Sequence, residues 1–249
     1  MPRILVLNPN TSTQMTDLLM RVLRPLAPEG VTLVPATGRF GAAYISSRSA
    51  AAIAAHAALD AYAEHREGCD AIYLSCFGDP GLLALRELSP VPVIGMAAAA
   101  CAEAAAQWGR FSIVTGGERW RPMLTEFVGT LGLGPHLASV EPLQATGGEI
   151  AQAPSQSLAA LAEACMRTVR RDGARAVILG GAGLAGLSER IQPLVEVPVI
   201  CSTRSGFRAV LAALPRPTEA CPEGLSHAVP PVASIGLSDR LASLISATG

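Results

Sequence analysis

Short, mostly apolar runs of strand length alternate with helical segments along the chain, and this alternation limits the possible folds more than any other feature. The runs RILVLN, VTLVPA, AIYLS and VPVIGM fill the first half, and FSIVTG, LASVEPL, AVILG and VPVICS fill the second. Such runs are typical of strands that are covered on both faces. Strands separated by helices form parallel sheets, so we predict an α/β fold with doubly wound, flavodoxin-like parallel sheets.

The alternation contains an internal repeat. AIYLSCFGDPGL, which begins at Ala71, matches AVILGGAGLAGL, which begins at Ala176, at a shift of 105 residues. At a shift of 106, VPVIGM from Val91 matches VPVICS from Val197. The matching segments keep the same order, so we infer two similar α/β halves that arose by duplication.

The repeat also gives an expected division into domains. We predict that residues 1–104 and 205–249 form the first domain and that residues 105–204 form the second. The final helix, at about 238–247, is then expected to pack back onto the first domain.

Local signals predict where several helices begin and end. Thr11 and Gln14 have the spacing of a capping box. A helix is expected over 47–66, with Gly68 as its C-cap. Asp79 and Pro80 have the residue types of the N-cap and first residue of the next helix, which makes Asp79 a cap rather than a base.

Composition excludes several classes of function. The 249 residues carry a formal charge of −1 and no long basic run, which argues against nucleic acid and against an anionic membrane as partners. MPRILVLNPN does not resemble a signal peptide, and no apolar run reaches the 18 residues of a membrane span. We therefore expect a cytoplasmic protein whose partner is a small molecule.

The reactive residue types narrow the chemistry further. The six cysteines lie far apart with no CxxC pair, so free thiols are expected, with no structural zinc. All 19 basic residues are arginine, which excludes a lysine Schiff base and a Walker-type phosphate loop. We expect no cofactor and no metal. GAGLAG, from Gly181, matches a dinucleotide-binding pattern, but no acid follows at the end of the next strand, at Cys201.

Ligands of parallel sheets bind beyond the carboxyl ends of the strands. If the two halves face each other, Asn8, Cys76, Thr115 and Gly181 become neighbours in one cleft. Free N–H groups near Cys76 are expected to favour the thiolate and lower its pKa. Such a thiolate removes a proton next to a carbonyl or returns one to an enolate. The alternative is that Cys76 is only a buried packing residue, with Cys201 a second strand-end candidate.

The segments ILVLNPNTSTQMT, CFGDPGL, VPVIGM, FSIVTG and ILGGAGLAGL resemble, in this order, the Asp/Glu/hydantoin racemase superfamily and its hydantoin and allantoin racemase branch. The resemblance implies two pseudo-symmetric α/β domains with the active site between them, and family members commonly form oligomers. It also implies cofactor-free proton transfer by two cysteines on opposite faces of the substrate carbon. Cys76 matches the first of them. The positions that match the substrate cradle are Asn8, Asn10, Thr11, Phe77, Gly78, Thr115, Gly116, Gly117, Gly181 and Ala182.

The chain departs from this pattern where the branch has its second cysteine, because Gly181 carries no thiol. The segment VPVICSTRSGF is more similar to the arylmalonate decarboxylase branch, which works with one cysteine. Three functions therefore stay open: a racemase or isomerase of hydantoin, allantoin or amino-acid type substrates; a single-cysteine decarboxylase or other stereospecific lyase; and a non-catalytic protein that binds a small molecule containing a carbonyl or carboxylate.

Overall fold

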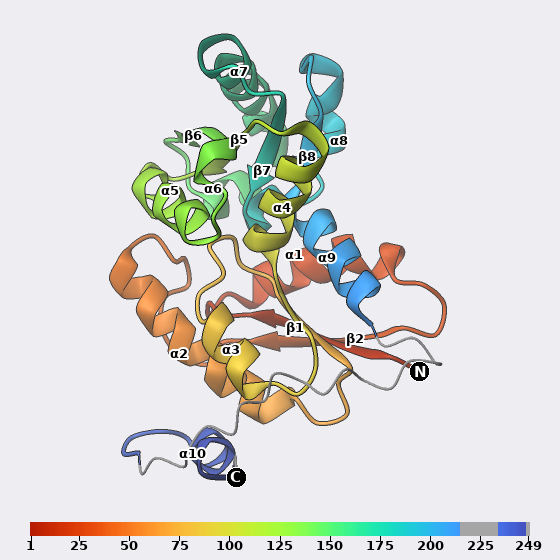
Figure 1. The fold of residues 1–249 in the computed structure, drawn as a ribbon, viewed down its shortest axis with the longest axis vertical. Helices are drawn as coiled ribbons and strands as arrows, with labels where there is room; N and C mark the ends of the chain where they lie inside the picture. The colour runs from red at the N-terminus through yellow and green to blue at the C-terminus, as the bar shows by residue number, and fades with distance from the viewer. Residues whose placement is uncertain (215–233, 248–249) are drawn as a thin grey trace.

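The computed structural model describes residues 1–214 and 234–247 and contains two four-stranded parallel sheets, one in each half of the sequence (Figure 1). The strand order is β2-β1-β3-β4 in the first sheet and β6-β5-β7-β8 in the second. The first sheet comprises β1 (Arg3–Asn8), β2 (Thr32–Thr37), β3 (Ala71–Leu74) and β4 (Val93–Gly95). The second comprises β5 (Phe111–Gly116), β6 (Leu137–Leu143), β7 (Ala176–Gly180) and β8 (Val199–Cys201). The predicted fold class is confirmed, and the repeated strand order is that of a duplicated flavodoxin-like sheet.

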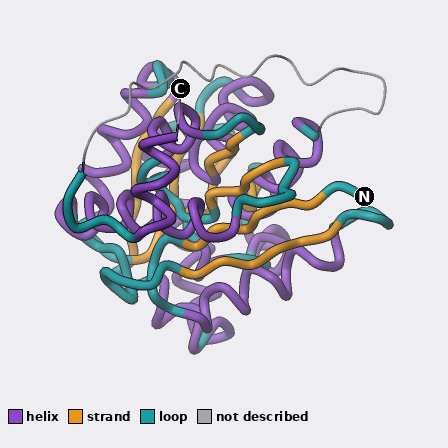
Figure 2. The backbone as a smooth tube through the Cα atoms, turned by 90° about the horizontal axis from the view of Figure 1, so that it is seen from below, coloured by secondary structure: helices purple, strands orange, loops and turns teal. Residues whose placement is uncertain are grey.

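Helices cover both sides of the strands (Figure 2). In the first half these are α1 (Thr13–Leu23), α2 (Arg48–His65) and α3 (Leu82–Leu88), with a 3-10 turn at Arg24–Leu26. In the second half they are α5 (Trp120–Thr130), α6 (Gly147–Gln152), α7 (Pro154–Asp172) and α8 (Ser188–Ile191), with 3-10 turns at Gly134–His136, Ala182–Leu184 and Gln192–Leu194. The remaining helices are α4 (Met96–Trp108), α9 (Ser202–Ala213) and α10 (Asp239–Ala247).

Helices α4 and α9 connect the two lobes and lie against each other between them (Figure 1). Helix α4 follows β4 of the first sheet but also contacts β7 of the second, while α9 follows β8 of the second sheet and contacts β3 of the first. Tyr73 of β3 donates a buried hydrogen bond to the Thr203 carbonyl of α9 at 2.9 Å. Each lobe thus provides one helix that packs on the sheet of the other lobe. The predicted domain boundary after residue 104 falls within α4, and the boundary after residue 204 falls within α9.

The apolar core has three parts, which follow from the two faces of each sheet. Ile4 and Val6 of β1 join Ile113 of β5 in a central cluster between the lobes. Leu5 and Leu7, which alternate with them, belong to the outer core of the first lobe. Every second residue therefore faces the same side, as the period of a strand requires, and both faces are buried.

Helix α10 packs on α2 at the outer side of the first lobe. Its Leu241 and Leu244 are buried in the outer core of that lobe. Ser238, just before the helix, donates a hydrogen bond of 2.5 Å to buried Asp60, which also pairs with Arg39. The C-terminal helix therefore seals the side of the first sheet that faces away from the second lobe.

Two cap predictions are wrong. The N-cap of α1 is Ser12, whose hydroxyl accepts from the Met15 N–H, and not Thr11. Asp79 does not cap α3, which begins after Gly81 without a side-chain cap. Its carboxylate instead accepts the Ala97 and Ala98 N–H groups at the start of α4, at 2.9 and 2.7 Å. Asp79 satisfies the free donors of a helix that begins 17 residues later, a contact that only the tertiary fold creates.

The helix predicted over 47–66 is observed as α2, with Ser47 as its N-cap. Its C-cap is Arg66, and Gly68 adopts a left-handed backbone two residues further on. Cys221 and His227 lie outside the described residues. Within 1–214 and 234–247, no helix is both long enough and apolar enough to cross a membrane, and no three His, Cys, Asp or Glu side chains gather as metal ligands would.

Candidate active site

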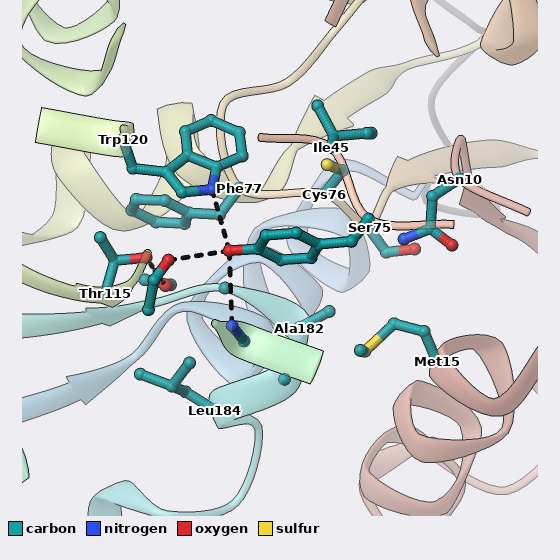
Figure 3. A pocket seen from close by; sticks show the side chains of 16 residues that line it. Asn10, Met15, Ile45, Ser75, Cys76, Phe77, Thr115, Trp120, Ala182 and Leu184 are labelled. Carbon is teal, nitrogen blue, oxygen red and sulfur yellow. Dashed lines mark hydrogen bonds between the residues drawn. The ribbon is translucent and has the colours of Figure 1, made fainter. Parts of the chain in front are cut away.

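A small cavity of about 50 Å³ lies where the carboxyl ends of the two sheets meet (Figure 3). Residues from both lobes line it. The predicted catalytic residue Cys76 is among them, together with six positions predicted for the substrate cradle: Asn10, Phe77, Thr115, Gly116, Gly181 and Ala182. Four predicted positions, Asn8, Thr11, Gly78 and Gly117, do not line this cavity.

Asn8 lies beneath the cavity and holds Asn10 in place. The Asn8 side-chain nitrogen donates to Asn10 Oδ1 at 2.8 Å and to Thr16 Oγ1 at 3.0 Å. Asn10 Oδ1 also accepts the Ser12 N–H at 2.9 Å, which fixes the orientation of the Asn10 amide. Asn10 Nδ2 makes no hydrogen bond with the described residues and points toward the cavity (Figure 3). Asn10 thus offers a donor for a carbonyl oxygen, and Asn8 supports it.

The other three predicted positions support the walls. Thr11 donates its N–H to the Ala42 carbonyl at 3.2 Å and so holds the loop that follows β2. A Cβ at Gly78 would lie 2.9 Å from the Trp120 ring, and a Cβ at Gly117 would lie 2.9 Å from the Tyr44 hydroxyl. Both glycines also have positive φ angles, so small residues are required there for two reasons.

Cys76 lies at the cavity wall with 9 % of its surface exposed. The expectation of a lowered pKa is wrong, because burial raises the pKa of this thiol to about 12 and the nearby Asp79 carboxylate adds to the shift. Burial also raises the pKa of Asp79, to about 7. Cys76 at rest is therefore a protonated thiol, which suits it to donate a proton.

Gly181 lines the same cavity from the second lobe. Its backbone has φ 130° and ψ 144°, a conformation that only glycine adopts readily. A Cβ at this position would meet Leu184 Cδ1 at 3.6 Å and Thr115 Oγ1 at 3.9 Å, both ordinary contacts. The cavity thus has room for a side chain at 181, but the backbone has a geometry that disfavours one.

The turns that carry Cys76 and Gly181 also supply N–H groups. The N–H groups of Phe77 and Ala182 have no acceptor in the described part of the chain, whereas the Gly181 N–H donates to Ser202 Oγ at 3.3 Å. The Thr115 hydroxyl donates to the Gly180 carbonyl at 2.7 Å, so its hydrogen is already committed. Unpaired N–H groups beside a cavity stabilise negative charge on a bound oxygen.

Phe77 closes the gap between the lobes. A Cβ at Gly180 would lie 2.5 Å from its ring, so the end of β7 must be glycine for the ring to reach across. Cys201, the second cysteine at a strand end, is buried at the start of α9 and does not line the cavity. Cys76 is therefore the only cysteine among the residues that line the described cavity.

The segment RFGAAYIS is expected from the sequence to line the substrate pocket, and its Tyr44 and Ile45, in the loop after β2, do line the cavity. Sequence reasoning missed other members of this wall. No sequence pattern marked Trp120, Met15 or Leu184 as site residues. An aromatic or aliphatic side chain near the start of a helix is as common in the hydrophobic core as in a binding site. Their place in the site depends on how the lobes face each other, which the repeat alone does not give.

The comparisons with known proteins agree with this architecture. A family model described as Asp/Glu/Hydantoin racemase matches residues 4–210. The chain belongs to this family. The family resemblance seen in the sequence is confirmed.

Relatives match over most of their length. Hydantoin racemase of Paenarthrobacter aurescens is 32 % identical over 208 residues, which is 83 % of this chain and 88 % of that protein. The structure of allantoin racemase from Klebsiella pneumoniae has a TM-score of 0.82 at 32 % identity and covers 98 % of this chain and 99 % of its own. Allantoin racemase from Pseudomonas fluorescens gives 0.81 at 28 % identity, covering 88 % and 99 %.

Proposed function

We propose that this racemase-family protein is a cofactor-independent enzyme that moves a proton at a carbon next to a carbonyl, and that Cys76 performs the transfer on one face only. The observation that carries the proposal is that one described cavity is lined by a single thiol, Cys76, from one lobe and by a turn without a side chain, Gly181, from the other. The relatives' names support a hydantoin or allantoin type substrate.

The proposed substrate binds with its carbonyl oxygen near Asn10 Nδ2 and the Phe77 and Ala182 N–H groups. The fraction of Cys76 that has lost its proton to solvent, as thiolate, removes the proton from the adjacent carbon, and the C–H electron pair moves into an enolate whose oxygen these donors stabilise. The thiol formed in this step exchanges its proton with solvent and then returns a proton to the same carbon. Because Gly181 has no acid to supply a proton from the opposite face, the configuration is retained in most turnovers.

The test compares isotope exchange with racemisation. Wild-type protein in heavy water is expected to introduce deuterium at the α-carbon of a chiral hydantoin faster than it racemises that carbon. Cys76→Ala should lower exchange by at least about 100-fold, as expected on removal of a catalytic acid–base group. Cys101→Ala, which changes a buried cysteine away from the cavity, is the matched control. Full exchange activity in Cys76→Ala would overturn the assignment.

A second candidate, a decarboxylase or other lyase, is favoured by the raised pKa of Cys76. A reaction that first loses carbon dioxide and then protonates the carbanion begins with the thiol, not the thiolate. Its rate should change little between about pH 6 and 9, whereas exchange that begins with proton removal should rise about tenfold per pH unit. Assays of a malonate panel and a hydantoin panel over this range distinguish the two. A protein that binds these compounds but turns over neither is the non-catalytic alternative.

A further inference from the structure

A second, larger chamber lies directly outside the cavity that holds Cys76. Its volume is about 420 Å³, against about 50 Å³ for the inner cavity. Tyr44 and Trp120 line both spaces and form the wall between them. The other residues of the outer chamber are Ser46, Gly117, Glu118, Arg119, Gln144 and Thr146.

Hydrogen bonds of one hydroxyl hold this wall together. Tyr44 comes from the first lobe, and its hydroxyl donates to the Gly116 carbonyl of the second lobe at 2.8 Å. The same oxygen accepts the Trp120 indole N–H at 3.2 Å and the Gly147 N–H at 3.4 Å (Figure 3). The loop after β2 that carries Tyr44 includes Gly41, which has a positive φ. The Tyr44 part of the wall is therefore a side chain on a loop held by exchangeable polar contacts, whereas Trp120 is packed in the central core.

The inner cavity is too small for a substituted substrate. A buried water needs about 10–15 Å³ of such space, so the inner cavity has room for about three or four waters. A group of that size matches the reacting carbon and its carbonyl. A larger substituent on that carbon that extends toward the outer chamber passes Tyr44.

The outer chamber offers polar side chains that have no other partner. Ser46, Glu118, Arg119 and Gln144 make no side-chain hydrogen bond or ion pair with the rest of the described chain. The chamber thus offers hydrogen-bond donors and acceptors, together with one negative charge, from Glu118, and one positive charge, from Arg119. This mixture fits an uncharged group that both donates and accepts hydrogen bonds, such as a carboxamide.

We propose that the outer chamber is a second subsite that binds a hydrogen-bonding substituent of the substrate, and that Tyr44 determines which substituents reach it. The proposal rests on the proposed function, because it assigns the inner cavity to the reacting carbon. Gln144, with both a donor and an acceptor, is the side chain expected to recognise a carboxamide.

The role of Tyr44 is tested without turnover, by labelling Cys76 at pH 9 with iodoacetamide and with a bulky fluorescein iodoacetamide. Peptide mass spectrometry reports Cys76 separately from the other cysteines. Tyr44→Ala should raise labelling by the bulky reagent at least tenfold, and Tyr44→Phe, which keeps the ring and loses the hydrogen bonds, should raise it less. Met15→Ala is the size control, since Met15 lines only the inner cavity. Equal effects of Tyr44→Ala and Met15→Ala would overturn the role of Tyr44.

The subsite is tested by protection of Cys76 from iodoacetamide. A hydantoin with a 2-carboxamidoethyl substituent should protect at a concentration at least about tenfold lower than its isobutyl analogue. Gln144→Ala should remove that difference, while Gln156→Ala, which lies outside this chamber, should keep it. Equal protection in the wild type would overturn the subsite. If protection behaves as expected but no hydantoin exchanges deuterium, the proposed function fails and the subsite stands.

Discussion

At the scale of single residues, Cys76 and Gly181 occupy equivalent positions of the two halves but differ in chemistry. Burial keeps Cys76 protonated, so its environment favours donation of a proton over removal of one. Gly181 has no side chain and also holds a backbone conformation that disfavours one. The asymmetry between these two positions is therefore built into both backbone and side chain.

The thiol of Cys76 should react slowly with iodoacetamide at neutral pH. Because its pKa is raised to about 12, the thiolate fraction and the rate should rise about tenfold per pH unit well above pH 9. Site-resolved mass spectrometry over pH 7–10 measures this, with free cysteine as the reference that levels off near its ordinary pKa. Rapid labelling that levels off near pH 7 would contradict the buried, protonated thiol.

Restoring a thiol at 181 should increase racemisation relative to exchange, because it supplies a proton donor to the second face. The positive φ of 130° should also destabilise Gly181→Cys by about 1–3 kcal/mol. Chiral chromatography with deuterium wash-in measures the first effect, and denaturant unfolding measures the second. Gly181→Ala is the matched control, with the same strain and no thiol. An unchanged ratio in a folded Gly181→Cys protein would show that the two positions do not face the same carbon.

At the scale of elements, Asp79 links the turn that carries Cys76 to the first turn of α4. Its left-handed backbone, with φ 45°, turns the carboxylate toward the Ala97 and Ala98 N–H groups. The space it occupies exists because residue 95 is glycine, where a Cβ would lie 2.2 Å from Asp79 Oδ2. The position of the thiol thus depends on the start of the helix that crosses between the lobes.

This contact predicts a pH dependence of stability. The pKa of Asp79 is raised from 3.8 to about 7 in the folded protein, so folding favours its protonated form. Its contribution to stability should be largest below about pH 4, decrease as the pH rises toward 7, and stay constant above that. In Asp79→Asn this dependence should be absent, and loss of one acceptor should cost about 1–3 kcal/mol at low pH. Denaturant unfolding at several pH values measures both, with exposed Asp17→Asn as the control; a slope retained in Asp79→Asn would contradict the assignment.

At the scale of the whole molecule, the exchanged helices α4 and α9 make the two lobes one cooperative unit. Tyr73 donates across the lobes to the Thr203 carbonyl, and a Cβ at Gly206 would lie 2.6 Å from the Tyr73 ring. The central core contains side chains from both sheets. Neither lobe has a complete core of its own.

Unfolding should therefore follow a single transition. Tyr73→Phe is expected to lower stability by about 1 kcal/mol, because it removes a buried hydrogen bond, while keeping one transition for both lobes. Tyr62→Phe is the matched control, because the Tyr62 hydroxyl makes a longer contact, 3.5 Å, within the first lobe. Calorimetry and circular dichroism measure both variants. Two separated transitions would show that the lobes fold independently.

The sequence predicted the features that depend on local pattern and on the repeat. All eight apolar runs are strands, and Cys76 and six predicted cradle positions line the cavity, because parallel strands bring their carboxyl ends to one edge. It could not distinguish Ser12 from the adjacent Thr11 as a cap, since both carry hydroxyls. Nor could it find the contact of Asp79 with α4, the depth of Cys76 that raises its pKa, or the contact of Tyr44 with Trp120, because these depend on how distant segments pack.

The exchange of α4 and α9 has a consequence for how such a chain arose. A half-length ancestor with this strand order would have lacked its last helix unless a second copy supplied one, so it would have existed as a swapped homodimer. Gene fusion of two such copies would have joined subunits that were already entwined. Once covalently joined, two former subunits are free to diverge, which a symmetric pair cannot do, and one half can carry a thiol at a position where the other has none.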